Sequence, residues 1–107
     1  MDEKLYAKCA AQAEVLRALG HPSRLYIVFQ LANGSQKCVC ELAAALGADM
    51  STVSRHLSVL KRVGILEEQK RGQMIFHKLR TPCVVELLEC IGRTIEQSLQ
   101  AKLSSLR

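Results

Sequence analysis

Two short amphipathic segments separated by a tight turn constrain the fold of this chain more than any other feature. Apolar residues recur every three or four positions in both segments, first at Val39, Leu42 and Leu46 and then at Val53, Leu57, Leu60 and Val63. Residues 47–50, Gly-Ala-Asp-Met, form the turn between them, and Ser51 is expected to cap the second helix. This spacing predicts a helix-turn-helix over residues 39–63.

Two further helices are expected before this motif. Residues 4–19 carry an apolar stripe at Leu5, Cys9, Ala13, Leu16 and Leu19. After Gly20-His21-Pro22, Ser23 can cap a second helix that runs to Leu31, with Leu25, Val28 and Phe29 facing inward. No linker or repeat interrupts the sequence, so we expect residues 1–107 to form a single domain.

A β-hairpin and a long helix are expected after the motif. Residues 65–79 contain two strand-like runs, Ile65–Gln69 and Met74–Leu79, around a basic tip. The sequence therefore predicts a mainly α-helical fold with a small β-hairpin wing, the winged helix-turn-helix. Residues 81–107 form the last helix, whose stripe has no domain left to cover it: Val84, Leu88, Ile91, Ile95, Leu99, Leu103 and Leu106. Residues 1–19 and 81–107 are thus expected to build a homodimer.

The composition favours an anionic partner and a cytoplasmic location. The net charge is +5, and aromatic residues make up only 4% of the 107 residues, which argues against a stacking platform for single strands. The N-terminus lacks the character of a signal peptide, and no apolar run is long enough to span a bilayer, so no membrane partner is expected.

The helix over residues 51–63 has the composition of a DNA-recognition helix. Opposite its apolar stripe lie short hydroxyl groups and arginines, at Ser51, Ser54, Arg55, Ser58 and Arg62. We expect the first three to contact base edges of double-stranded DNA in the major groove. Arg62 and the wing residues Lys70 and Arg71 are better placed for phosphates. His56, at the flank of the stripe, is expected to be packed and hydrogen-bonded rather than to contact bases.

Five cysteines, an odd number, favour metal binding or redox sensing over a disulfide scaffold. Cys38 and Cys40 stand at the start of the helix over residues 39–46, where the helix dipole favours thiolates. Residues two apart in a continuous helix point about 200° apart, so both sulfurs can reach one ion only if Cys38 precedes the helix or the first turn unwinds. A ligand that closes across this turn would pull on the helix that packs against the recognition helix.

Two thiolates do not complete a tetrahedral zinc site or a three-thiolate metalloid site. The further ligand is expected among Cys9, Cys83 and Cys90. Cys9 and Cys90 lie in apolar stripes, where a core role is the alternative. Cys83 and Cys90, one heptad apart on the last helix, are candidates for a second or redox site.

These motifs together resemble the ArsR/SmtB family of winged-helix metal-responsive repressors over nearly the whole chain. The resemblance is carried by residues 18–25 (ALGHPSRL), 38–42 (CVCEL), 51–57 (STVSRHL), 60–66 and the wing. It implies a homodimeric repressor that binds its operator without ligand and releases it when ligand binds. The Cys-Val-Cys segment is similar to the arsenical and the cadmium/lead branches.

The resemblance leaves the inducer open. Arsenite or antimonite bound by Cys38 and Cys40, with Cys9 as third ligand, is the favoured interpretation. Ala43 stands where arsenical repressors often have a third cysteine, and in the cadmium/lead branch cysteines near the other subunit's N-terminus complete the site. Cd²⁺, Pb²⁺ or Zn²⁺ is therefore an alternative, as is thiol oxidation or persulfide sensing with no bound metal. No residue pattern indicates an enzyme.

Overall fold

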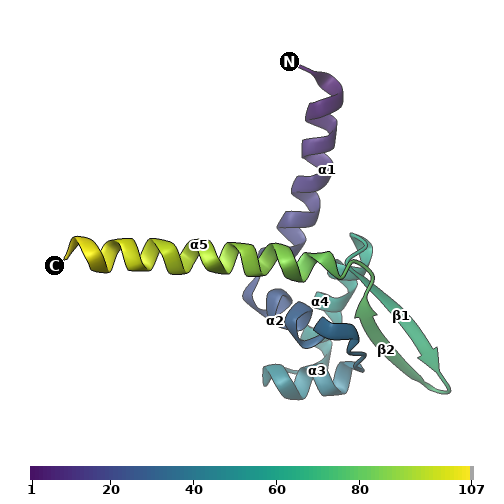
Figure 1. Cartoon of the computed structure of the whole chain (residues 1–107). Helices are drawn as coiled ribbons and strands as arrows, with labels where there is room; N and C mark the ends of the chain where they lie inside the picture. The colour runs from purple at the N-terminus through teal and green to yellow at the C-terminus, as the bar shows by residue number, and fades with distance from the viewer. Residues whose placement is uncertain (107) are drawn as a thin grey trace.

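The protein is a winged helix-turn-helix with two long helices that project from a compact body (Figure 1). The computed structural model describes residues 1–106. Its elements are, in chain order, α1 (Glu3–Leu19), α2 (Pro22–Gln30), the short 3-10 turn η1 (Ala32–Gly34), α3 (Val39–Leu46), α4 (Met50–Arg62), β1 (Leu66–Arg71), β2 (Met74–Leu79) and α5 (Cys83–Ser105). The predicted fold class is confirmed.

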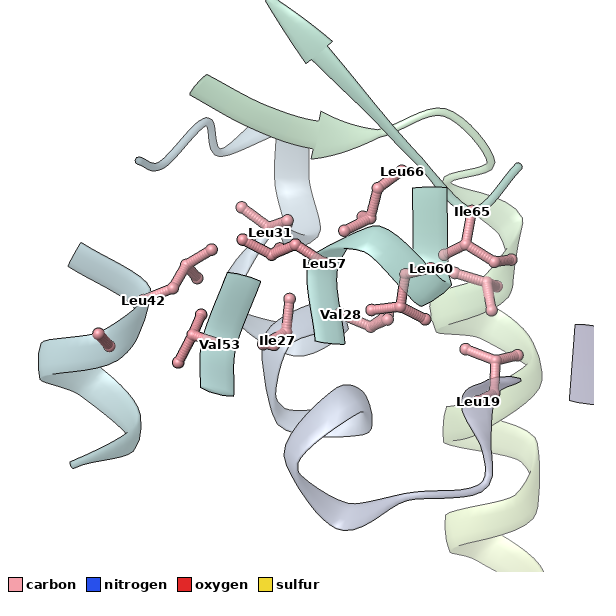
Figure 2. Close-up of a cluster of buried hydrophobic side chains, with 12 residues drawn as sticks. Leu19, Ile27, Val28, Leu31, Leu42, Val53, Leu57, Leu60, Ile65 and Leu66 are labelled. Atoms are coloured by element: carbon pink, nitrogen blue, oxygen red, sulfur yellow. The ribbon is translucent and has the colours of Figure 1, made fainter. Parts of the chain in front are cut away.

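The core lies where α2, α3 and α4 pack together and meet the base of the wing (Figure 2). Its fully buried side chains are aliphatic: Ile27, Val28, Leu31, Leu42, Val53, Leu60 and Leu66. The apolar stripe predicted for residues 51–63 supplies all the buried residues of α4, which are Val53, Leu57 and Leu60. This packing fixes which face of α4 is exposed.

The helix-turn-helix lies where the sequence predicts it, with one change at the start of α4. Gly47 ends α3 in the left-handed region, at φ 67°, which a glycine adopts without strain. Asp49, and not Ser51, caps α4, because its Oδ1 accepts the backbone N–H of Thr52 at 3.2 Å. The helix consequently begins at Met50 and includes Ser51 in its first turn.

The cap and the inward face of α2 also differ from the prediction. His21, and not Ser23, caps this helix, because its ring Nδ1 accepts the backbone N–H of Ser23 at 3.1 Å. Val28 is buried and Leu25 is half-buried, but Phe29 is exposed, since the contacts of α2 with the core are made through Ile27 and Val28.

The wing is an antiparallel hairpin whose strands pair from Leu66↔Leu79 to Arg71↔Met74. β1 is longer at the tip than predicted, so that Lys70 and Arg71 belong to the strand rather than to the turn. An isolated bridge between Lys37 and His77 adds one residue pair beside β2. The wing is therefore tied to the segment that precedes α3.

The two long helices expose the apolar stripes predicted for them. Figure 1 shows α1 and α5 extending away from the body in different directions. Within the protomer, α1 buries only Ala18 and Leu19 and α5 buries only Val84, so the distal stripe of α5 is solvent-exposed: Ile91, Ile95, Leu99, Leu103 and Leu106. No helix in residues 1–106 combines the length and apolar character needed to cross a membrane.

Candidate functional site

The predicted DNA-contacting residues of α4 share its exposed face. Ser51, Ser54, Arg55, Ser58 and Arg62 are all exposed. The helix dipole and the cap at Asp49 order the first turn, where the hydroxyl of Ser51 donates to Asp49 Oδ2 at 3.0 Å. Arg55 Nη2 donates to Thr52 Oγ1 at 3.3 Å, which directs this arginine along the helix.

Asp49 remains ionised at the start of α4. Hydrogen bonds from Thr52 and Ser51, together with the nearby charge of Arg55, lower the pKa of this carboxyl. The negative charge of Asp49 neutralises part of the basic surface. The carboxylate also accepts the hydrogen bond that the Ser51 hydroxyl donates. Ser51 can therefore offer an incoming base an acceptor more readily than a donor.

Lys70 and Arg71 lie beside the tip of the wing and are both exposed. The guanidinium of Arg71 lies over the ring of Phe76, 5.0 Å from the ring centroid. Its Nη2 also donates to Gln36 Oε1. Arg71 is thus held by the segment before α3, whereas the structure gives Lys70 no such partner among residues 1–106.

The Cys38–Cys40 pair meets without any unwinding of α3. Cys38 is the N-cap residue, with an extended backbone at φ −81° and ψ 168°, and Cys40 lies in the first turn. The two Cα atoms are 5.4 Å apart, and the sulfur atoms are joined in a disulfide. Cys38 therefore precedes the helix, which is one of the two geometries that the sequence allowed.

Cys38 is further fixed by Glu41, the third residue of α3. The backbone N–H of Cys38 donates to Glu41 Oε1 at 3.2 Å, and the same oxygen lies 3.3 Å from Cys38 Sγ. Cys38 is buried at 5% exposure, while Cys40 is exposed. The pair therefore has one accessible sulfur and one that is shielded and lies beside a carboxylate oxygen.

The other three cysteines are free and exposed, and none of them is a core residue of the protomer. The alternative of a core role for Cys9 and Cys90 is wrong for the single chain, because these positions of α1 and α5 project from the body. Within residues 1–106 no three histidine, cysteine or acidic side chains converge to hold a metal ion. Cys9 lies far along α1 and does not join Cys38 and Cys40 in the same protomer.

A groove of about 480 Å³ connects the thiol pair to α4, the predicted recognition helix, and to the wing. Cys38 and Cys40 form one wall, Ser54 and Ser58 of α4 form another, and the wing contributes residues of β2 that include His77. Sequence reasoning predicted that the thiols lie one helix away from the recognition helix. The structure brings them to a common surface with it.

Two contacts couple the thiol segment to the wing. Lys37 and His77 exchange both backbone hydrogen bonds, at 2.8 and 3.1 Å. Arg71 donates to Gln36, two residues before Cys38. The ring of His77 is buried, and this burial lowers its pKa, with the nearby charge of Glu68 acting in the opposite sense. These contacts join two residues before α3, Gln36 and Lys37, to both strands of the wing.

His56 is packed and hydrogen-bonded, as the sequence predicted. Its Nδ1 accepts from Arg24 Nε at 3.1 Å, and its ring lies 4.6 Å from that of His21. Burial lowers the pKa of His56, and the charges of the surrounding basic residues act in the same direction. The ring is therefore a neutral acceptor for Arg24.

Sequence reasoning missed Gln36 and Arg24 as parts of the site. Gln36 is in contact with a residue 35 positions away, and Arg24 with one 32 positions away. Neither position carries a local pattern that would show such a partner, since both contacts depend on the tertiary fold.

Comparison with known proteins identifies the family. The family profile described as "Bacterial regulatory protein, arsR family" matches residues 21–68. An uncharacterised helix-turn-helix-type transcriptional regulator from Methanocaldococcus jannaschii is 34% identical over 74% of this chain and 89% of that protein. The chain belongs to the ArsR family of transcriptional regulators. It is a DNA-binding regulator and not an enzyme.

Relatives with named roles differ in what they sense. The arsenic resistance transcriptional regulator ArsR1 of Pseudomonas putida is 30% identical over 84% of this chain and 70% of that protein. The cadmium resistance transcriptional regulatory protein CadC of Listeria innocua is 30% identical over 68% of this chain. The chain spans only 61% of the length of CadC. The likeness therefore extends to the family and not to one inducer.

Solved structures share the fold. Reduced HlyU from Vibrio cholerae superposes with a TM-score of 0.75 at 27% identity, covering 83% of this chain and 96% of HlyU. A homodimeric winged helix-turn-helix DNA-binding domain from Mycobacterium bovis, a possible ArsR-family regulator, superposes with a TM-score of 0.77 at 28% identity. That comparison covers 91% of this chain and 88% of the domain.

Proposed function

We propose that this ArsR-family regulator is a cytoplasmic homodimeric repressor that releases its operator when a soft metalloid binds Cys38 and Cys40. Arsenite or antimonite is the favoured inducer. The observation that carries the proposal is the groove that Cys38 and Cys40 line together with residues of α4 and the wing.

DNA binding is assigned to two exposed surfaces of each subunit. Ser51, Ser54 and Arg55 would contact base edges in the major groove, with Ser58 beside them. Arg62, Lys70 and Arg71 would hold phosphates and fix the register of the protein on the duplex. The shared exposed face of α4 and the basic edge of the wing support this division.

Dimerisation through α1 and α5 is supported by the apolar surface that both helices expose. Ile95 is 64% exposed and Leu99 57% exposed in the protomer, and α1 exposes Leu5 and Leu16 in the same way. A monomer rarely leaves so long an apolar stripe in water. The homodimeric Mycobacterium bovis domain, which superposes on 91% of this chain, is consistent with a second copy as the cover.

The chemistry of the sulfurs favours a soft ligand. Thiolates prefer trivalent arsenic and antimony, or Cd²⁺, Pb²⁺ and Zn²⁺, over hard cations. Two sulfurs of one protomer leave such a ligand incomplete, and the exposed Cys9 of the partner subunit's α1 is our proposed third ligand. The need for a fourth ligand would make Cd²⁺ or Zn²⁺ harder to satisfy than a three-coordinate metalloid.

Release of DNA would follow from movement of the segment before α3. A ligand on Cys38 displaces residues that are tied to the wing through Lys37–His77 and Gln36–Arg71. The same ligand occupies a groove that Ser54 and Ser58 line, so it also changes the surface of α4. Allosteric coupling of about 1–3 kcal/mol per site would weaken DNA binding roughly 5- to 150-fold.

X-ray absorption on arsenite-loaded protein tests the ligand set. We expect three sulfur neighbours around arsenic in the wild type and two in both the Cys40→Ser and the Cys9→Ser variants. Cys83→Ser is the matched control and should retain three. A wild-type site with oxygen or nitrogen neighbours only would contradict the assignment.

A second candidate function is thiol-redox sensing, which the disulfide between Cys38 and Cys40 favours. Hydrogen peroxide would oxidise the two thiols to the disulfide and would itself be reduced to two molecules of water. Mass spectrometry separates the two functions. An operator release that accompanies loss of two hydrogens from one chain, without bound metalloid, would support the redox function.

A further inference from the structure

A second groove borders α4 where this helix meets the start of α2. It has a volume of about 550 Å³, and three arginines, Arg24, Arg55 and Arg62, line it together with His21 and His56. We name it the cationic groove. No carboxylate of residues 1–106 lines it.

The arginine and histidine side chains that line the cationic groove can all donate hydrogen bonds to a ligand. His56 Nδ1 accepts from Arg24 Nε at 3.1 Å, and His21 Nδ1 accepts from the backbone N–H of Ser23 at 3.1 Å. Because Nδ1 accepts in both rings, the ring proton lies on Nε2, which can donate it. Guanidinium groups have donors and no acceptor, so the groove suits a ligand that only accepts hydrogen bonds.

The donors are held in place by contacts inside the protein. Arg24 also donates through Nη1 to the carbonyl oxygen of Ala18 at 3.2 Å, which anchors its guanidinium to the end of α1. The rings of His21 and His56 are 4.6 Å apart and tilted by 50°. A preorganised set of donors loses little side-chain entropy when it binds a ligand.

We propose that the cationic groove binds a phosphodiester group of the DNA backbone beside the recognition helix. Phosphate oxygens accept hydrogen bonds and pair with guanidinium groups in bidentate geometry. Arg55 and Arg62 belong to α4, so a duplex in contact with this helix brings phosphates near the groove. The DNA contact then extends from α4 to α2, through Arg24 and His21, beyond the recognition helix and the wing.

Two variants separate the charge of the groove from its donors. Arg24→Gln keeps an N–H donor for His56 and removes the charge. His21→Asn keeps an acceptor that can cap α2 and removes the ring. Arg93→Gln, which removes an exposed arginine of α5 outside the groove, is the matched control.

The measurement is the affinity for a random-sequence duplex as a function of salt concentration. For Arg24→Gln we expect the slope of log K against log salt to fall by about 0.9 for each phosphate no longer neutralised. His21→Asn should weaken binding without a change of slope, and Arg93→Gln should match the wild type. A slope for Arg24→Gln equal to that of Arg93→Gln overturns the proposal for the cationic groove. If the wild type still binds the duplex in that case, the proposed DNA binding by the protein stands.

The ring nitrogens of the wild-type protein give a test that needs no variant. Nitrogen NMR should show shifts of His21 and His56 Nε2 when the duplex is added at constant ionic strength. Rings that do not respond to the duplex overturn the proposal. Rings that respond to inorganic phosphate and not to the duplex assign the groove to a free anion, which also overturns it.

Discussion

Leu99→Ala should weaken the dimer without unfolding the protomer. Leu99 lies on the exposed stripe of α5 and is 57% exposed in the single chain. Full burial of a leucine side chain contributes about 1.5–3 kcal/mol, so burying the exposed half in a dimer contributes about 1 kcal/mol. The substitution changes both subunits, which makes the loss about 2 kcal/mol and raises the dimer dissociation constant roughly 30-fold.

Sedimentation equilibrium over a range of protein concentrations measures this constant. Gln97→Ala, on the other side of the same helix, is the control and should leave the constant unchanged. The thermal midpoint of Leu99→Ala should depend on protein concentration, because dissociation and unfolding are linked. A wild-type protein that is monomeric throughout, or an equal effect of the two substitutions, would refute the assignment of α5 to the dimer interface.

Three further predictions concern the core, the histidines and the link to the wing. Leu60→Ala should lower the free energy of unfolding by about 2–5 kcal/mol at any protein concentration in chemical denaturation, because Leu60 is fully buried. Burial lowers the pKa of both His56 and His77, so the unfolded chain takes up protons at a higher pH than the folded protein does. The free energy of unfolding should therefore be at its full value above about pH 6.5 and should fall as the pH drops below it. Thermal midpoints measured against pH test this, with the His56→Gln/His77→Gln double variant as the control. Gln36→Ala removes the contact with Arg71 and should reduce the factor by which arsenite weakens operator binding, measured by fluorescence anisotropy, without changing the sulfur count around arsenic.

The arrangement of helices and strands could be predicted because the local patterns agree with the tertiary packing. The apolar stripe of residues 53, 57 and 60 is the face that α4 buries, and Gly47 is the left-handed residue that ends α3. The helix starts were less predictable. Asp49 and His21, and not Ser51 and Ser23, are the N-cap residues. Several neighbouring residues can cap a helix, and the path of the chain before the helix decides between them.

The candidate site could be predicted only in part. The exposure of the residues assigned to DNA on α4 and the wing follows from periodicity. The positions of the thiols against the recognition helix and the wing do not, since they depend on contacts across the fold such as Lys37–His77. The exposure of Cys9 and Cys90 could not be predicted from the sequence either. An apolar stripe that packs in a core has the same spacing of apolar residues as a stripe that faces a second subunit.

Arsenite titration of the protein–operator complex tests the central proposal most directly. Operator DNA selected from a random library would be labelled, and its anisotropy followed for the wild type, Cys38→Ser and Cys40→Ser. We expect arsenite to release the wild type and to leave both variants bound, with equal operator affinity for all three before arsenite is added. Release of the variants at the wild-type arsenite concentration, or variants that bind no operator without arsenite, would contradict a sensing role for the thiol pair.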